Sequence, residues 1–504
     1  MPVVDWLPVS VKLVHFEFGH ACGLLWVCIH QNCVAEAMPK VVTFFLPQFH
    51  PVPENDAFWG KGFTDWINVA RAKPQFEGHN QPDVPADLGF YDLRLVDTLR
   101  AQAELARQYG VHGFCFHYYW FAGRKLLNGP LENLLNNKDI DLPFCLNFAN
   151  ENWTRRWDGL DDEILIEQKH SDEDDRQFIR ALLPYFRDER YIRIAGKPVL
   201  LVYKTFLLPD AAKTAKIWRE EMAKSGIDLY LIKCESGRPN QPPGEIGFDA
   251  AVEFPPQCPS YKEGIDELIH LEKRDEYAIS SAGELTKLSR SFNGKLIDYR
   301  LLANFFCRKE LPPYPLFRCV MPGWDNTPRK KAESSIYLHS SPGHYRAWLS
   351  YVLNWTAVTR PPDEQIVFVN AWNEWGEGAH LEPCQKYGRA YLEATGNALS
   401  SFSSDGLQPP DFVAPLTPGD FSLVQQRARE LVAKNGDGAE SNGQAQDVAA
   451  VLAQEVCRLS EENRKLGQQI ADLTSELHQV YTSRSWVLSE PLRKVNLMIK
   501  GSAK

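Results

Sequence analysis

The chain lacks a surplus of basic residues. Its 504 residues contain 55 Lys and Arg against 65 Asp and Glu, which gives a formal net charge of −10. Because binding to a phosphate backbone requires a basic face, this balance argues against a nucleic-acid-binding protein. Eleven cysteines are present, but we find neither Cys-x-x-Cys pairs nor the Cys/His spacing of a metal site. We therefore expect buried reduced thiols, with no disulfide framework, no metal and no other cofactor.

The first part of the chain lacks an apolar run long enough to span a bilayer. The run from Ala21 to Ile29 is too short, and the residues before it include Asp5 and Glu17 instead of a basic stretch. Met38 leads directly into a predicted strand, as the start of a cytoplasmic protein would. We therefore expect residues 1–38 to be a disordered or wrongly assigned extension, and the protein to be cytoplasmic.

A glycine-rich phosphate loop is also missing after the first predicted strand, where residues 47–50 read Pro-Gln-Phe-His. This absence weakens the doubly wound sheet as an alternative fold. Apolar runs alternate with helical patterns, which predicts a parallel sheet, and eight strands favour an α/β fold of the (β/α)8 barrel type. The predicted strands are 41–46, 113–118, 143–148, 199–203, 229–234, 250–254, 318–321 and 366–371. The predicted helices are 93–108, 172–186, 210–224 and 343–356.

Polar and aromatic residues follow most of the predicted strands, where a barrel carries its catalytic groups. The most informative stretch is 372–378, which reads Trp-Asn-Glu-Trp-Gly-Glu-Gly after the last strand. Its glycines argue against a helix, and its tryptophans indicate an aromatic-walled pocket that holds Glu374 and Glu377. Two carboxyl groups in an aromatic cleft are the usual equipment for work on glycosidic bonds. Spacing alone leaves Glu151 with Glu374 open as an alternative pair.

The composition changes after Ser400. Residues 401–446 form a linker rich in Pro, Gly and Ser with a short helix, and residues 447–482 show apolar positions at spacings of three and four from Ala449 to Val480. Asn463 at one core position predicts a parallel two-stranded coiled coil, and hence a homodimer through residues 449–480. Residues 483–504 form a basic amphipathic tail, which we interpret as a peripheral contact with the inner membrane, with a solvated basic tail as the alternative.

Several long motifs resemble the WbsX-type domain, a glycoside hydrolase family 99-like domain found in polysaccharide and O-antigen loci. The resemblance covers about residues 39–400. The motifs are Phe44–His50, Asn55–Trp66, Gly113–Trp120, Asn150–Gly159, Lys197–Tyr203 and Trp372–Gly378.

The resemblance implies a (β/α)8 barrel and a retaining reaction on α-mannoside-like sugars. In family 99 endo-α-mannosidases, the first Glu of a Glu-x-x-Glu pair acts as a base on the 2-hydroxyl and gives a 1,2-anhydro intermediate, and the second is the general acid/base. These roles would belong to Glu374 and Glu377, with no metal or nucleotide. The sugar subsites would be lined by Tyr118, Trp120, Asn150, Glu151, Trp153, Tyr203, Trp372, Asn373 and Trp375.

WbsX-type proteins are also described as glycosyltransferases, which usually hold a sugar diphosphate through an Asp-x-Asp metal site or a basic cradle. No Asp-x-Asp follows a predicted strand, and Arg155-Arg156 is the one basic pair near the predicted face. We therefore favour a hydrolase or transglycosylase acting on cell-surface polysaccharide. A glycosyltransferase of polysaccharide synthesis is the alternative. A non-catalytic glycan-binding scaffold is the second alternative, disfavoured by the presence of both glutamates.

Overall fold

The computed structural model describes residues 38–76, 78–155, 160–237, 241–257, 272–274, 277–279, 285–287, 292–330, 333–402, 408–410 and 412. All of them belong to one compact unit, Met38–Lys504. The predictions for the extension before Met38, the coiled coil at 447–482 and the tail at 483–504 lie outside the described residues. Within the described residues, no helix has both the length and the apolar composition needed to cross a membrane.

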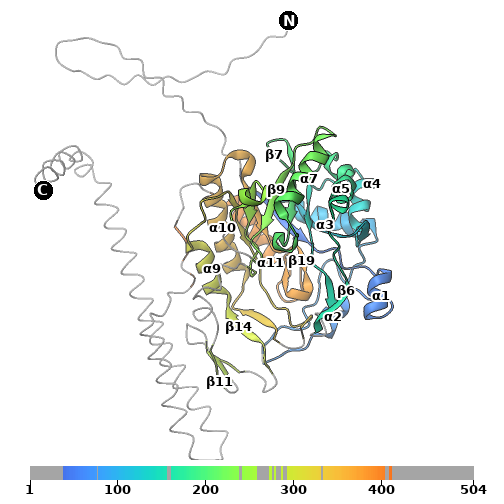
Figure 1. Cartoon of the computed structure of the whole chain (residues 1–504). Helices are drawn as coiled ribbons and strands as arrows, with labels where there is room; N and C mark the ends of the chain where they lie inside the picture. Colours follow the sequence, from blue (N-terminus) through green and yellow to red (C-terminus); the bar gives the residue numbers. More distant parts are fainter. Residues whose placement is uncertain are drawn as a thin grey trace, which may run out of the picture. The chain divides into compact units, whose positions relative to one another are not determined.

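A parallel sheet forms the centre of the domain (Figure 1). Its strand order is β15-β10-β9-β8-β4-β2-β1-β18-β16, and every neighbouring pair along this path is parallel. The strand bounds are β1 Lys40–Phe45, β2 Val111–Phe121, β4 Phe144–Phe148, β8 Lys197–Val202, β9 Tyr230–Cys234, β10 Ala250–Val252, β15 Leu316–Phe317, β16 Cys319–Val320 and β18 Ile366–Val369.

The two ends of this strand order belong to one stretch of chain. β15 pairs with β10 and β16 pairs with β18, and only Arg318 separates β15 from β16. The stretch 316–320 therefore closes the sheet into a barrel and counts as its seventh strand. With β18 as the eighth, the predicted (β/α)8 barrel is confirmed.

A buried ion cluster lies at this closure. The Arg318 Nε donates to Glu253 Oε2 at 3.0 Å, and the Cys319 backbone N–H donates to the same oxygen at 3.0 Å. Lys309 Nζ lies 2.8 Å from Glu253 Oε1. Glu253 is fully buried, so its charge is balanced by Arg318 and Lys309 and not by water.

Long helices cover the outside of the barrel, with α9 and α10 on one side of the strands and α3, α5 and α7 on the other (Figure 1). Their first turns are capped where the sequence offers Ser or Asp, as Ser171 does for α5 and Asp210 for α7. The predicted helix 172–186 is interrupted at Leu182, because Pro184 cannot donate a backbone hydrogen bond. The bounds are α1 Pro53–Trp59, α2 Trp66–Arg71, α3 Val96–Gln108, α4 Gly129–Asn136, α5 Asp172–Ala181, α6 Leu183–Phe186, α7 Ala211–Ala223, α9 Tyr299–Arg308, α10 Pro342–Thr359 and α11 Ala390–Ser400.

Short strands and 3-10 turns build the loops around the barrel. The strands are β3 Arg124–Leu126, β5 Trp153–Arg155, β6 Leu160–Ile166, β7 Arg193–Ile194, β11 Glu272–Arg274, β12 Tyr277–Ile279, β13 Leu285–Lys287, β14 Lys295–Asp298, β17 Ser335–Leu338, β19 Asn373–Glu374 and β20 Ala379–His380. The turns are Thr205–Leu207, Pro243–Ile246, Pro362–Glu364 and Trp375–Glu377. The stretch 372–378 thus forms a short strand and a tight turn just after β18.

Candidate active site

Asn373 fixes the loop after β18 to the end of β1. Its Oδ1 accepts a hydrogen bond from the Leu46 backbone N–H at 2.7 Å, and its Nδ2 donates to the Leu46 carbonyl at 3.0 Å. The same Nδ2 donates to the Tyr91 hydroxyl at 3.1 Å. A side-chain amide can make this pair of bonds because it carries both an acceptor and a donor. Asn373 is fully buried. Its hydrogen bonds to Leu46 hold the loop after β18 against the end of β1.

The two tryptophans of the loop are packed beneath it. Trp372 lies against Phe114, with ring centroids 4.8 Å apart, and is fully buried. Trp375 stacks on His380 with centroids 3.7 Å apart, and its Nε1 donates to Glu382 Oε2 at 2.7 Å. These contacts hold the backbone that carries Glu374 and Glu377.

One guanidinium joins both glutamates. Arg329 Nη2 lies 2.9 Å from Glu374 Oε2, and its Nη1 lies 2.9 Å from Glu377 Oε1. The same Nη2 lies 2.6 Å from Asp65 Oδ2. Arg329 and Asp65 are buried, whereas the Glu377 side chain keeps 24% of its surface exposed. Arg329 therefore places Glu374 and Glu377 at a fixed separation on one wall.

Three carboxyl groups around one guanidinium favour keeping a proton in the cluster. Burial raises the pKa of Glu374 to about 8; Arg329 opposes this rise, while Glu377 and Asp65 add to it. Removing a proton here places a further negative charge in a water-poor site, which is costly. Glu374 therefore keeps its proton to a higher pH than an exposed glutamate does.

Gly376 leaves space for Arg329 and Asp65 because it has no side chain. A Cβ at this position would lie 2.5 Å from Arg329 Nε and 2.7 Å from Asp65 Oδ2. Both atoms belong to the Arg329–Asp65 ion pair, so a side chain at this position would have to displace that pair. The glycine between the two glutamates is thus required by the close approach of Arg329.

Glu374 and Glu377 face a cavity of about 200 Å³ at the carboxyl ends of the barrel strands. Its walls combine flat aromatic rings with side-chain amides, which suits the faces and hydroxyl groups of sugar rings. The other lining residues are Leu46, Gln48, Asn55, Trp59, His117, Tyr119, Ala149, Glu151, Asn152, Trp153, Thr154, Leu165, Tyr203, Phe254, Gln257, Arg329 and Asn370.

Comparison with known proteins assigns the barrel domain to a family. A family model described as Glycosyltransferase WbsX matches residues 41–395, which extend from β1 into α11. The chain belongs to the WbsX glycosyltransferase family.

Curated relatives come from Xanthomonas campestris pv. campestris, where two strains each have a protein described as "Uncharacterized protein WxcX". In strain B100 it is 45% identical over 379 residues, and in a second strain 46% identical over 370 residues. The matches cover 74% and 72% of this chain but 52% and 50% of the relatives. The chain therefore spans about half the length of the curated relatives it matches.

Solved structures with a similar arrangement include a GH99 endo-alpha-mannosidase from Bacteroides thetaiotaomicron in complex with BIS-TRIS-propane. It is 14% identical, with a TM-score of 0.44, and the match covers 72% of this chain and 97% of the mannosidase. A structure described as a glycoside hydrolase-like protein is 13% identical with a TM-score of 0.43, over 76% of this chain and 97% of its own. At these values, neither likeness identifies the chemistry of this WbsX-family chain.

Five of the eleven predicted site residues line the cavity of about 200 Å³: Glu374, Glu377, Glu151, Trp153 and Tyr203. Glu151 pairs with Lys204 Nζ, whereas Glu374 and Glu377 share Arg329. Both pairings considered from the sequence, Glu374 with Glu377 and Glu151 with Glu374, therefore face the same space.

The other six predicted residues do not line this cavity. Trp372, Asn373 and Trp375 support the loop from below. Asn150 makes a similar pair of hydrogen bonds, because its Oδ1 accepts from the Lys204 N–H at 2.9 Å and its Nδ2 donates to the Lys204 carbonyl at 2.8 Å.

Tyr118 and Trp120 lie on the opposite face of β2 from the cavity. Both pack on Phe178 of α5, and the Trp120 Nε1 donates to Asp174 at 2.9 Å. Successive side chains of a strand point to opposite faces, so their neighbours His117 and Tyr119 face the cavity instead.

Two central residues, Asp65 and Arg329, were not assigned from the sequence. Asp65 lies in the motif Asn55–Trp66 of the family resemblance, so this motif was a signal that could have pointed to it. Arg329 lies between β16 and β17, outside all the quoted motifs, and only the folded structure brings it to the glutamates.

Proposed function

We propose that this WbsX-family chain is a retaining glycoside hydrolase or transglycosylase acting on α-mannoside-like sugars of cell-surface polysaccharide, of the O-antigen or lipopolysaccharide type. The observation that carries the proposal is the pair Glu374 and Glu377, held by one Arg329 on the wall of an aromatic- and amide-lined cavity. Two carboxyl groups beside a sugar-sized cleft are the common arrangement of glycosidases. The position at the carboxyl end of a barrel agrees with it.

In the proposed reaction, the Glu374 carboxylate accepts the proton of the sugar 2-hydroxyl while that oxygen attacks C1. The bond from C1 to the leaving oxygen breaks, and Glu377 donates a proton to that oxygen. A water molecule, or an acceptor hydroxyl in a transglycosylase, then attacks C1 and gives its proton to Glu377. The C1–O2 bond opens and Glu374 returns the proton to O2, so the stereochemistry at C1 is retained.

This sequence of steps requires Glu374 to be ionised before the sugar reacts. Because burial raises the pKa of Glu374 to about 8, the ionised fraction grows as the pH rises toward that value. We therefore expect the rate to rise with pH across this range. Arg329 lies between the two glutamates and stabilises the carboxylate that the first step needs.

The cavity walls support a sugar substrate. Trp59, Trp153, Tyr203 and Phe254 offer ring faces or edges, and the amides of Gln48, Asn55, Asn152 and Gln257 offer paired donors and acceptors for hydroxyl groups. Some of these groups already form bonds within the wall: Tyr203 donates to Gln257 Oε1 at 2.5 Å, and Gln48 Nε2 donates to Tyr119 at 3.1 Å. Such bonds hold the wall in position before a sugar binds.

A glycosyltransferase is the second candidate, and the description of the matching family favours it. A sugar-nucleotide donor would need a cation or basic residues for its diphosphate. Arg155 lies 5.8 Å over the Trp59 ring and pairs with Glu163 at 2.5 Å. A diphosphate at this edge of the cavity would compete with Glu163 for Arg155.

Turnover assays distinguish these functions. We expect the protein to release reducing sugar from α-mannoside oligosaccharides, and Glu374→Gln and Glu377→Gln to lower this rate at least about 10²-fold. The control variant Glu393→Gln, on the exposed surface of α11, should keep the wild-type rate. Nucleotide-sugar-dependent transfer that survives both active-site substitutions would contradict a hydrolase. Glycan binding without turnover in any sample would indicate a scaffold.

We also propose that residues 449–480 join two chains in parallel, and that the basic tail 483–504 brings the dimer to the inner membrane from the cytoplasm. The heptad pattern with Asn463 at a core position supports the dimer. Light scattering of the full chain is expected to give twice the chain mass of 57.4 kDa, and a chain ending at residue 446 is expected to be monomeric. Equal monomeric masses for both samples would end this proposal.

A further inference from the structure

A second polar cluster lies outside the catalytic cavity. Asp83, His380 and Cys384 each direct one potential metal ligand to the same point, and these three atoms lie within 4.8 Å of one another. His380 Nε2 is 2.8 Å from Asp83 Oδ2. Asp83 and His380 also line a separate cavity of about 150 Å³, together with Trp324, Tyr337 and Tyr387.

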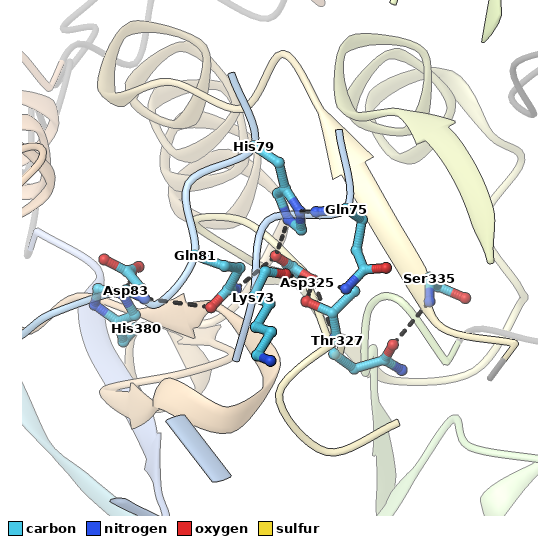
Figure 2. A network of polar contacts seen from close by, with 10 residues as sticks. Lys73, Gln75, His79, Gln81, Asp83, Asp325, Thr327, Ser335 and His380 are labelled. Carbon is cyan, nitrogen blue, oxygen red and sulfur yellow. Dashed lines mark hydrogen bonds and ion pairs between the residues drawn. The ribbon is translucent and has the colours of Figure 1, made fainter. Parts of the chain in front are cut away.

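Figure 2 shows His380 beside Asp83, with a polar network next to them. The Asp83 backbone N–H donates to Gln81 Oε1 at 3.2 Å, and Gln81 Nε2 donates to Asp325 Oδ2 at 2.6 Å. His79 Nε2 lies 2.7 Å from the same Asp325 oxygen. This network fixes the segment that delivers Asp83.

His380 is oriented as a metal ligand would be. Its Nδ1 lies 2.9 Å from the Glu382 carbonyl oxygen and donates to it, so Nε2 is the ring nitrogen that faces Asp83 and Cys384. Histidines that bind a metal commonly donate their other N–H to a carbonyl or carboxylate in this way. The ring is held in addition by its stack on Trp375.

Cys384 is oriented with its sulfur toward the same point. The backbone N–H groups of Lys386 and Tyr387, two and three residues later, are directed at its Sγ. The Gly388 N–H closes the turn by donating to the Cys384 carbonyl at 2.7 Å. A metal binds the deprotonated form of a cysteine, so the Cys384 thiol would release its proton when the ion binds.

Asp83 completes the set with one oxygen to spare. Its Oδ1 is buried and has no hydrogen-bond partner within the part of the chain that the structure describes. Backbone bonds between the segments 84–86 and 383–385 hold Asp83 beside Cys384: Gln385 N donates to Val84 O, and Ala86 N donates to Pro383 O, both at 2.8 Å.

We propose that Asp83, His380 and Cys384 bind one divalent transition-metal ion of the zinc class, with the fourth position open to water or a ligand. A set of one oxygen, one nitrogen and one sulfur suits Zn²⁺ or Co²⁺. Ca²⁺ and Mg²⁺ prefer oxygen ligands alone. No residue of this set lines the catalytic cavity, so the ion would not itself contact the sugar.

The bound ion would join two distant parts of the chain next to the catalytic loop. Asp83 and His380 are 297 residues apart, which is why cysteine spacing alone did not indicate the site. His380 and Cys384 follow the turn that carries Glu377, and the Asp325 N–H donates to the Glu377 carbonyl at 2.6 Å. Metal binding would therefore fix the position of Glu377 without touching its carboxylate.

Cobalt binding tests this site in the full chain. After treatment with a chelator, addition of Co²⁺ is expected to give one bound ion per chain, with the near-ultraviolet charge-transfer absorption of a thiolate-bound cobalt and the strong visible bands of a tetrahedral site. Zn²⁺ should displace the cobalt. Cys384→Ser should remove the charge-transfer absorption, and Cys307→Ser, which changes a buried thiol in α9, should keep it.

Two further measurements keep the test decisive if Cys384→Ser does not fold. Asp83→Asn should weaken Co²⁺ binding at least about tenfold while preserving the thiolate absorption. Zn²⁺ should raise the unfolding temperature of the chelator-treated wild type, because it binds only the folded site. A wild-type chain that shows no thiolate absorption with Co²⁺, or a folded Cys384→Ser chain that keeps it, would overturn the proposal.

Discussion

Arg329→Met is expected to lower turnover by about 10²- to 10⁴-fold and to move the rising limb of the pH–rate profile to higher pH. Arg329 is the only cation of the described residues within 4.0 Å of Glu374, and it opposes the rise that burial gives to the pKa of that carboxyl. Without Arg329 the pKa of Glu374 rises further, so less of the base is ionised at neutral pH. When the pKa of a mostly protonated carboxyl rises by one, its ionised fraction falls about tenfold.

Two matched variants separate charge from packing. Arg329→Lys keeps the charge but cannot bond several carboxylates in a fork, so a smaller loss of rate is expected. Asp65→Asn removes one of the negative charges that raise the pKa of Glu374. The rising limb of the pH–rate profile of this variant should therefore move to lower pH. The diagnostic result is a rising limb that moves to higher pH in Arg329→Met and to lower pH in Asp65→Asn.

The measurement is kcat/KM against pH for these variants and the wild type. An unchanged profile in both Arg329→Met and Asp65→Asn would show that the cluster does not set the protonation of Glu374. A wild-type rate that falls as the pH rises through about 8 would show that Glu374 acts as the acid, and would exchange the two proposed roles.

Glu253→Gln is expected to lower the free energy of unfolding by about 3–5 kcal/mol, because it leaves buried cations without their counter-charge. Burial on its own raises the pKa of Glu253, but Arg318 and Lys309 outweigh it and hold the pKa below its usual value. The stabilisation by such a carboxylate is present above its unfolded pKa and is lost as the pH falls through its folded pKa. The difference in stability between wild type and variant should therefore narrow in acid.

Thermal unfolding at a series of pH values measures this effect. Glu393→Gln on the exposed surface of α11 is the control and should change stability by less than about 0.5 kcal/mol. A double variant, Glu253→Gln with Arg318→Met, removes one buried charge of each sign. It should recover part of the free energy of unfolding that Glu253→Gln loses. Equal stability of wild type and Glu253→Gln at neutral pH would contradict the role of this pair in closing the barrel.

The barrel was predictable because its strands leave a strong local signal. Strands buried on both faces appear as continuous apolar runs, as in residues 41–46 and 199–203, and helices alternate with them. The split of the seventh strand at Arg318 was not predictable, because a buried arginine depends on the distant Glu253 and Lys309.

The carboxylate pair and part of the cavity wall were also accessible from the sequence, while the direction of individual side chains was not. Tyr118 and Trp120 were expected at the sugar subsites from the family resemblance, whereas His117 and Tyr119 are the residues of β2 that line the cavity. Asn150 and Asn373 turned out to bond backbone groups of neighbouring loops. Nothing local distinguishes an amide that clamps a loop from one that binds a sugar.

The pairing of β1 with β18 also has a consequence for biosynthesis. Lys40 pairs with Ile366, and Asn373 bonds Leu46 across 327 positions of the chain. Contacts of such large sequence separation form late, because a long loop must first be closed. As the ribosome releases the chain, Asp65 emerges long before Arg329, Glu374 and Glu377. A nascent chain therefore has no assembled carboxylate cluster until its last strand is complete, and products that end before Glu374 lack the site.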